Sequence, residues 1–321
     1  MRLGKLTNTQ LEELILNKFT FRRDEVVLSP RVGVDCAAVD LKGDLAVLST
    51  DPITAADKNL GRLTVHVSCN DAAAAGAEPV GLLVTLLAPP SATEEDIGRV
   101  ADELKEASEL AGIEILGGHT EVTDSVTRMV TCATVLAKAA ADGLITSGGM
   151  KPGDDIVLTK HAGLEGTAVI ASDKRDALAD VTEAELEEAR GFFSELSVVK
   201  EGLFAARHGA TAMHDVTEGG VLGAAWEMAE ASGCGADIDT ASVPVRPVTK
   251  KICSALGIDP FRLLSSGCML IACPNGEALA AGLNAIGVEA AVIGRATHIR
   301  AVTAGGKPVA PPEADELYRL F

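Results

Sequence analysis

Short aliphatic runs of strand length alternate with longer helical segments along the whole chain. In the first half, residues 45–49 and 80–87 are aliphatic runs, while 61–77 and 94–110 have the periodicity of helices. The second half continues the alternation and includes a long helical stretch at 182–208. An alternation of this kind is typical of proteins in which helices pack on the faces of a sheet. The sequence therefore predicts an α/β fold.

A turn-rich stretch separates the two halves of the chain. It contains Gly148-Gly149, followed closely by Lys151-Pro-Gly153. The length of 321 residues, at about 150 residues per domain, also predicts two domains. We place them at residues 1–148 and 149–321. Since 47% of the residues are hydrophobic but only 3% are aromatic, we expect cores built from Ala, Val, Leu and Ile.

The charge of the chain excludes two classes of partner. The formal net charge is -18, from 46 acidic and 28 basic side chains. Nucleic acids and anionic membranes require a basic surface, so we expect neither as a partner. The longest strongly apolar stretch, residues 80–88, is far shorter than the roughly 20 residues of a membrane span. The seven cysteines form no Cys-x-x-Cys pair, which favours buried thiols in a reducing compartment. We therefore expect a cytoplasmic protein.

Four acids stand beside small residues or directly after predicted strands: Asp35, Asp51, Asp71 and Glu121. Carboxylate oxygens suit Mg²⁺, a hard cation that bridges proteins to substrate phosphates. A role in a turn or in helix capping is the alternative for Asp35 and Asp51. The acids therefore predict a magnesium site, through which an acidic protein could hold a phosphate.

Two glycine pairs follow predicted strands. The first lies in Leu116–Glu121 (Leu-Gly-Gly-His-Thr-Glu), where the glycines would free backbone amides. The second ends His214–Gly220 and opens a predicted helix, whose N-terminus could bind an anion. Lys160–Thr167 has a similar glycine-bearing turn. Neither a Walker A motif nor a dinucleotide-binding Gly-x-Gly-x-x-Gly follows a strand, which argues against P-loop enzymes and dinucleotide-dependent oxidoreductases.

In their order along the chain, these clusters resemble the motifs of the aminoimidazole ribonucleotide (AIR) synthetase, or PurM-like, superfamily. Gly33–Val39 is similar to its Gly-Asp-Asp-Ala-Ala-Val, and Asn70–Pro79 to its Asn-Asp-(Leu/Ile)-Ala-x-x-Gly-Ala-x-Pro. Ser49–Asp51, Leu116–Thr120 and Asp215–Gly220 resemble three further motifs. The resemblance covers nearly the whole chain. It is nearest the branch that contains HypE-type hydrogenase maturation proteins and thiamine-monophosphate kinase.

The resemblance implies a two-domain PurM-like fold, in which the N-terminal domain binds ATP and Mg²⁺ and pairs across a homodimer. It also implies ATP-dependent phosphorylation of an oxygen on an acceptor. The metal set that we derive from it is Asp35, Asp51 and Asp71, to which we add Glu121. The residues that we assign to the nucleotide are polar or glycine positions: Lys5, Asn70, Gly117, Gly118, His119, Thr120, Asp215 and Glu218.

The chain departs from its relatives at several positions. Cys36 stands where they carry a second acid, and His119 where the kinase and the hydrogenase protein carry Asp. The HypE type acts through a C-terminal cysteine, whereas the last cysteine here is Cys273, so we do not expect that cysteine-borne reaction. Selenophosphate synthetase carries an N-terminal Cys or Sec that is not seen beside Lys5. We expect an ATP- and Mg²⁺-dependent enzyme with an unassigned acceptor; the alternative is a non-catalytic ATP-binding maturation or scaffold protein.

Overall fold

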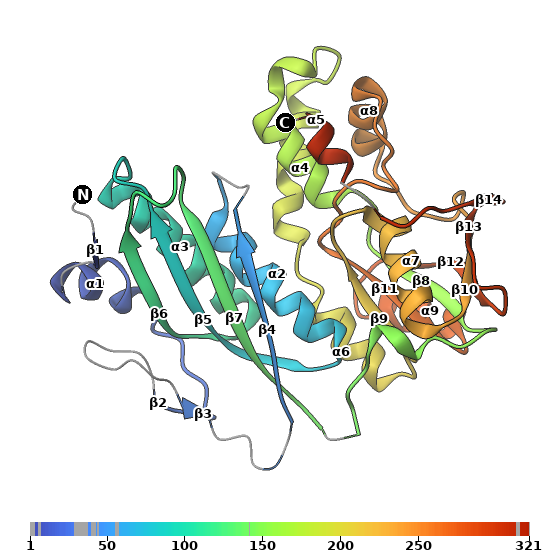
Figure 1. The fold of residues 1–321 in the computed structure, drawn as a ribbon, viewed down its shortest axis with the longest axis horizontal. Helices are drawn as coiled ribbons and strands as arrows, with labels where there is room; N and C mark the ends of the chain where they lie inside the picture. The colour runs from blue at the N-terminus through green and yellow to red at the C-terminus, as the bar shows by residue number, and fades with distance from the viewer. Residues whose placement is uncertain are drawn as a thin grey trace. The chain divides into compact units, whose positions relative to one another are not determined.

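The chain folds into two compact units (Figure 1). The computed structural model describes residues 4–5, 8–28, 38–39, 43, 45–54, 58–140, 142–312 and 315–320. The first unit comprises residues 1–72 and 77–142, and the second comprises 73–76 and 143–321. The boundary predicted after residue 148 stays a prediction. No helix in the described part of the chain is long and apolar enough to cross a membrane.

The first unit is built on a five-stranded sheet in the order β1-β6-β5-β7-β4 (Figure 1). Its strands are β1 (Gly4–Lys5), β4 (Leu45–Ile53), β5 (Glu78–Ala88), β6 (Glu114–Val122) and β7 (Val130–Ala139). Strands β5 and β6 run parallel, and the other neighbours are antiparallel. The helices are α1 (Asn8–Leu14), α2 (Leu60–Ala74) and α3 (Glu94–Ala111), with a 3-10 turn η1 (Leu16–Lys18). A separate pair of strands joins β2 (Val26–Leu28) to β3 (Ala38–Val39).

One face of this sheet is covered by helices α2 and α3, and the other is open (Figure 1). The two helices cross closely, because a Cβ at Gly61 on α2 would lie 2.4 Å from the carbonyl oxygen of Val100 on α3. Helix α2 contacts the covered face through Thr64, whose hydroxyl lies 2.6 Å from that of Thr131 on β7. The open face carries Leu48 and Leu83, which are 62% and 42% exposed. Antiparallel sheets commonly have one face that is exposed to solvent. Large apolar side chains such as leucine are unusual on that face.

The second unit is built on a seven-stranded sheet in the order β14-β13-β10-β12-β8-β11-β9. Its strands are β8 (Asp155–Thr159), β9 (Ala212–Val216), β10 (Gly235–Ile238), β11 (Cys268–Cys273), β12 (Ala290–Thr297), β13 (Val302–Ala304) and β14 (Lys307–Pro308). Its helices are α4 (Leu164–Asp173), α5 (Glu183–Gly191), α6 (Val199–Arg207), α7 (Gly220–Ser232), α8 (Pro247–Leu256) and α9 (Gly276–Ala285). Short 3-10 turns complete it: η2 (Ser147–Gly149), η3 (Arg175–Ala177), η4 (Phe192–Glu195) and η5 (Glu316–Leu320).

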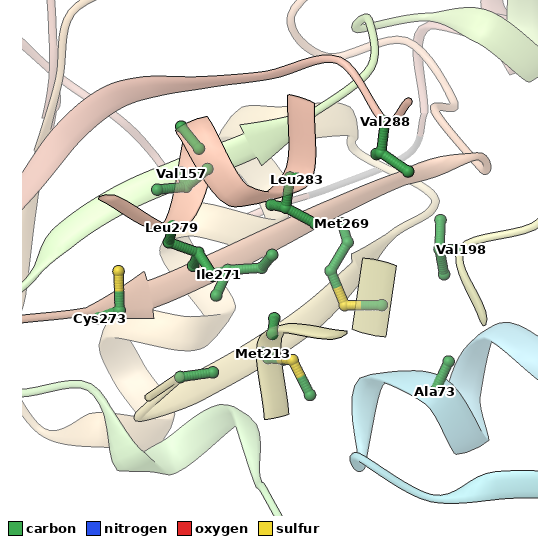
Figure 2. Close-up of a cluster of buried hydrophobic side chains, with 13 residues drawn as sticks. Ala73, Val157, Val198, Met213, Met269, Ile271, Cys273, Leu279, Leu283 and Val288 are labelled. Carbon is green, nitrogen blue, oxygen red and sulfur yellow. The ribbon is translucent and has the colours of Figure 1, made fainter. Parts of the chain in front are cut away.

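The core of the second unit is aliphatic and sulfur-rich, as the composition predicted for the aliphatic part (Figure 2). Leu279 and Leu283 on α9 lie against Ile271 and Met269 on β11 (Figure 2). These four side chains are at most 4% exposed. Burying an aliphatic side chain of this size stabilises a fold by about 1.5–3 kcal/mol. The predicted α/β fold with helices packed on sheets is therefore confirmed.

Candidate functional site

Asp51 and Asp71 lie on the covered side of the first unit's sheet. Asp71 is in α2, and its carboxylate accepts a hydrogen bond from the Ser49 hydroxyl on β4. Asp51 is two residues beyond Ser49 on the same strand, so its side chain points to the same face. The Oδ2 atom of Asp51 is buried and has no hydrogen-bond partner among the described residues. The structure thus brings two of the predicted metal ligands to one side of the sheet.

The buried oxygen of Asp51 has the chemistry of a cation ligand. A buried carboxylate oxygen is strongly destabilising unless a charge or a donor compensates for the lost water. A cation between Asp51 and Asp71 would supply that compensation, and hard oxygen ligands are the ones that Mg²⁺ takes. Asp35, the third predicted ligand, lies outside the described residues. Within those residues, no three His, Cys, Asp or Glu side chains converge on a metal position.

Strand β4 is longer than the sequence predicted. We expected it to end where the polar cluster 49–52 begins, but the strand continues through Asp51 to Ile53. Pro52 is tolerated there because β4 is at the edge of the sheet, where a residue without a backbone N–H leaves no ladder position unpaired. Asp51 is therefore held rigidly inside a strand, rather than at the start of a turn.

The segment Gly117–Glu121 was also expected to follow a strand, and it lies inside β6. Gly117 and Gly118 have φ angles of 151° and 149°, which side-chain-bearing residues rarely adopt. A Cβ at Gly118 would lie 1.8 Å from the carbonyl oxygen of Val84 on β5. The expectation that this glycine pair lies beyond the end of a strand was therefore wrong. At Gly118, glycine is required for the close approach of two paired strands.

His119 and Glu121 point to the open face, away from Asp51. Through the paired residues of β7 and β5, Asp51 shares its row and its face with Gly118. Since side chains alternate along a strand, His119 and Glu121 lie on the opposite face. Their side chains contact each other, with Nε2 and Oε2 3.3 Å apart. The structure does not bring Glu121 to Asp51, and its role as a metal ligand stays a prediction.

The other nucleotide residues predicted in the first unit are Lys5, Asn70 and Thr120. Asn70 is buried in α2 beside Asp71. Thr120 is two residues beyond Gly118 on β6, so it points to the covered side. Lys5 lies in β1 opposite Glu121 in register, and its side chain lies outside the described residues.

In the second unit, Asp215 lies in strand β9 beside a charged histidine. Asp215 is 7% exposed, and its Oδ2 atom has no hydrogen-bond partner among the described residues. His214 contacts it, with Nδ1 and Oδ1 3.8 Å apart, and contacts Glu227 Oε2 at 3.0 Å. Burial alone would lower the pKa of His214, but its interactions with the acidic side chains of Asp215 and Glu227 outweigh burial and raise the pKa to about 9. His214 is therefore an imidazolium at neutral pH.

Glu218 and the N-terminus of α7 are engaged by residues near the end of the chain. The Glu218 carboxylate accepts a hydrogen bond from the Tyr318 hydroxyl at 2.6 Å. Gly219, which caps α7, donates its backbone N–H to Asp315 Oδ2 at 2.7 Å. Asp315 accepts two further backbone N–H groups, at 3.2 and 2.8 Å. The N-terminus of α7 therefore holds an internal carboxylate, where the sequence suggested an external anion.

Glu165, on the first turn of α4, is a candidate that we did not assign from the sequence. Its side chain is 7% exposed, and its Oε2 has no hydrogen-bond partner in the described part of the chain. Burial raises the pKa of Glu165 to about 7, with a smaller lowering by a hydrogen bond from Ser266 and further raising by Asp315 and Glu218. The glycine-bearing turn at 160–167 was a signal for Glu165. Asp315 belongs to no motif, so nothing in the sequence could have indicated it.

Both halves of the chain match domains of known proteins. Residues 33–138 match the N-terminal domain of AIR synthase related proteins, and residues 151–306 match the C-terminal domain. A protein named carbamoyl dehydratase HypE from Rhizobium leguminosarum bv. viciae is 31% identical over 275 residues, which are 82% of this chain and 77% of that protein.

Two solved structures share the fold over almost the whole chain. A hydrogenase maturation protein HypE, solved in complex with ATP, superimposes with a TM-score of 0.81 at 22% identity and covers 96% of each chain. A thiamine-monophosphate kinase from Stenotrophomonas maltophilia K279a has a TM-score of 0.77 at 21% identity and covers 94% of this chain and 97% of its own. With both domains matched in sequence and in fold, the chain belongs to the family of AIR synthase related proteins.

Proposed function

We propose that this chain is an enzyme that uses ATP and Mg²⁺ to phosphorylate an oxygen atom of an acceptor. The observation that carries the proposal is the buried Oδ2 of Asp51, which has no hydrogen-bond partner among the described residues and lies on the same side of the sheet as Asp71. The complex of a fold relative with ATP supports a nucleotide as the second ligand. A metal between the carboxylates and the phosphates would allow a chain of net charge -18 to bind ATP.

In this proposal, each polar residue on the covered side has a task. Asp51 and Asp71 hold the cation through their carboxylate oxygens. The Ser49 hydroxyl, hydrogen-bonded to Asp71, fixes the orientation of that carboxylate. Bound Mg²⁺ would neutralise negative charge on the phosphates. Asn70 and Thr120 would contribute an amide and a hydroxyl to the nucleotide.

The acceptor atom that we propose is an amide or carbamoyl oxygen. The 31% identical relative is named as a carbamoyl dehydratase, an enzyme that removes water from a carbamoyl group. The carbamoyl oxygen is a poor leaving group, but after phosphorylation it leaves as phosphate while the nitrogen loses its protons. Phosphorylation and dehydration are then two halves of one reaction. A phosphate oxygen is the alternative acceptor, since a fold relative is a thiamine-monophosphate kinase.

Oxygen-18 labelling tests the proposed chemistry. The protein is incubated with ATP, Mg²⁺ and a small carbamoyl compound labelled with oxygen-18 in its carbonyl group. If the carbamoyl oxygen is phosphorylated and expelled, the label appears in the released phosphate, and Asp71→Asn abolishes its appearance. Asp124→Asn, at an exposed turn, is the matched control and should transfer label like the wild type. Phosphate that is released without label, together with dehydrated product, would contradict the proposal.

A non-catalytic ATP-binding maturation or scaffold protein is the second candidate. Cys36, in place of an acid that relatives carry, is the observation that favours it. Slow ATP hydrolysis does not separate the two functions, because it needs no acceptor. Incubation with a metabolite pool and ATP labelled in its γ-phosphate does separate them: an enzyme yields a labelled metabolite, and a scaffold yields none.

We also propose that two copies of the chain associate through the open face of the first unit's sheet. Leu48 and Leu83 are large apolar side chains that water reaches on this face. Large apolar side chains exposed on one face of a sheet favour association. The polar pair of His119 and Glu121 lies on the same face, on the strand next to that of Leu83.

A further inference from the structure

The turn after β8 places a lysine ammonium among backbone carbonyl groups. Lys160 Nζ donates hydrogen bonds to the carbonyl oxygens of Glu195 at 3.0 Å, Ser197 at 2.5 Å and Gly267 at 2.8 Å. Lys160 itself has a φ of 51°, a left-handed conformation that is uncommon outside glycine, Asn and Asp. Its side chain is only 15% exposed. The backbone conformation at Lys160 is therefore maintained against an intrinsic preference, and the contacts of Nζ compensate for it.

A fourth oxygen reaches the same nitrogen. Glu201 Oε1, on α6, lies 2.6 Å from Lys160 Nζ, and the Glu201 side chain is 2% exposed. An ammonium group has three N–H bonds, and the three carbonyl groups accept all of them. Within the described residues, Glu201 Oε1 accordingly accepts no hydrogen bond, although it is buried at ion-pair distance from Nζ. The three carbonyl oxygens and Glu201 Oε1 form a cage around Nζ. This cage has one more oxygen than the ammonium has N–H bonds to donate.

A spherical cation can serve all four oxygens, because it has no fixed number of donors. Backbone carbonyl groups are the ligands by which proteins replace the water shell of potassium. The oxygens here lie 2.5 to 3.0 Å from the nitrogen, further than the about 2.0–2.1 Å that Mg²⁺ requires. One carboxylate among neutral carbonyls balances a single positive charge.

We propose that the four oxygens around Lys160 form a monovalent-cation site that the chain fills with its own tethered ammonium. The site joins four separate segments: the turn after β8, the end of η4 with the residues that follow it, α6, and the turn before β11. Because the ammonium of Lys160 occupies the site, the packing of these four segments does not depend on the potassium concentration. Removing the ammonium should convert the cage into a site for free K⁺ or NH₄⁺.

The cage matters because the turn before β11 positions the start of α4. Ser265 Oγ accepts the backbone N–H of Gly163, the N-cap of α4, at 2.7 Å. Ser266, the next residue, provides the hydrogen bond to Glu165. Gly267 follows them and places its carbonyl oxygen in the cage. Lys160 is thus a positioning residue that holds the turn through which Glu165 is oriented.

Thermal unfolding in different chloride salts at constant ionic strength tests the proposal. The Tm of the wild type should not depend on which cation is present. Lys160→Ala leaves a buried charge unpaired, so its Tm in tetramethylammonium chloride should be lower by about 5–15 °C. Most of that loss should be recovered, with saturation, in NH₄Cl or KCl. Tetramethylammonium is the control for ionic strength, because it is too large for the cage.

Two further variants of the cage and one control variant distinguish cation binding from a general loss of stability. Lys160→Met fills the cage with an apolar group, so it should lose stability without recovery in any salt. Lys160→Ala combined with Glu201→Gln should lose the preference for K⁺ and NH₄⁺, since the compensating charge is gone. Lys251→Ala, which breaks the surface pair of Lys251 and Glu185 at 2.7 Å, is the matched control and should show no cation-specific recovery. A Tm of Lys160→Ala that is the same in KCl, NH₄Cl and tetramethylammonium chloride, or failure of this variant to fold in every salt, overturns the proposal.

Discussion

Four carboxylates have a buried oxygen without a hydrogen bond in the described part of the chain, and each is compensated in a different way. They are Asp51, Glu165, Glu201 and Asp215. Glu201 faces the ammonium of Lys160, and Asp215 has a protonated histidine beside it. Glu165 holds a proton up to a pH of about 7. Asp51 has none of these among the described residues, and in the proposed function a bound cation would compensate for it.

The proton on Glu165 makes stability depend on pH. Its pKa is raised from 4.5 to about 7 in the folded state, so the folded chain keeps a proton that the unfolded chain loses. Stability therefore falls as the pH rises through that window. Glu165→Gln imitates the protonated side chain, and it should match the wild type at pH 5 but exceed its free energy of unfolding by up to about 3 kcal/mol at pH 8.

Urea denaturation of both proteins at pH 5 and pH 8 measures this difference. Glu188→Gln, at an exposed position on α5, is the control, and its effect should not change with pH. An equal difference between Glu165→Gln and the wild type at both pH values would contradict the assignment.

At the scale of the element, β6 shows how a polar motif can be part of a regular strand. Its glycines allow β6 to lie against β5, and the alternation of side chains then sends Thr120 to the covered face and His119 and Glu121 to the open one. The motif is therefore divided between the two faces of the sheet. Residues that are adjacent in the sequence need not share a site.

Gly118→Ala tests the close approach of the two strands. The added Cβ would collide with a backbone carbonyl oxygen, and alanine disfavours a φ of 149°. We expect a loss of about 2–4 kcal/mol in the free energy of unfolding. Gly98→Ala is the matched control, because nothing lies within 4 Å of its Cβ on helix α3. That variant should be more stable than the wild type by about 1 kcal/mol, and a comparable loss in both variants would refute the argument.

At the scale of the whole molecule, the open face of the first unit predicts the oligomeric state. Leu48→Arg combined with Leu83→Arg would place two charges on the proposed interface and should give a monomer in sedimentation velocity, while the wild type sediments as a dimer. Leu110→Arg changes a leucine that is 81% exposed on α3, and it should leave the dimer intact. A wild type that is monomeric at high concentration would refute the proposed interface.

Much of the fold could be predicted from the sequence, because the aliphatic runs became strands. The run at 80–87 lies within β5, whereas the helical stretch expected at 182–208 is divided into α5 and α6. The ends of β4 and β6 could not be predicted, since an edge position and a missing Cβ allow polar residues to continue a strand. The contact between Gly219 and Asp315 spans 96 residues and depends on tertiary packing alone.

Calorimetric titration with ATP tests the central claim most directly, because it measures the metal, the nucleotide and the two acids together. The account predicts that ATP binds in the presence of Mg²⁺ and that binding is lost when EDTA replaces the metal. It also predicts that Asp51→Asn and Asp71→Asn each weaken binding by at least about tenfold, while Asp124→Asn does not. Tight binding of ATP that is unchanged by EDTA and by both substitutions would contradict it.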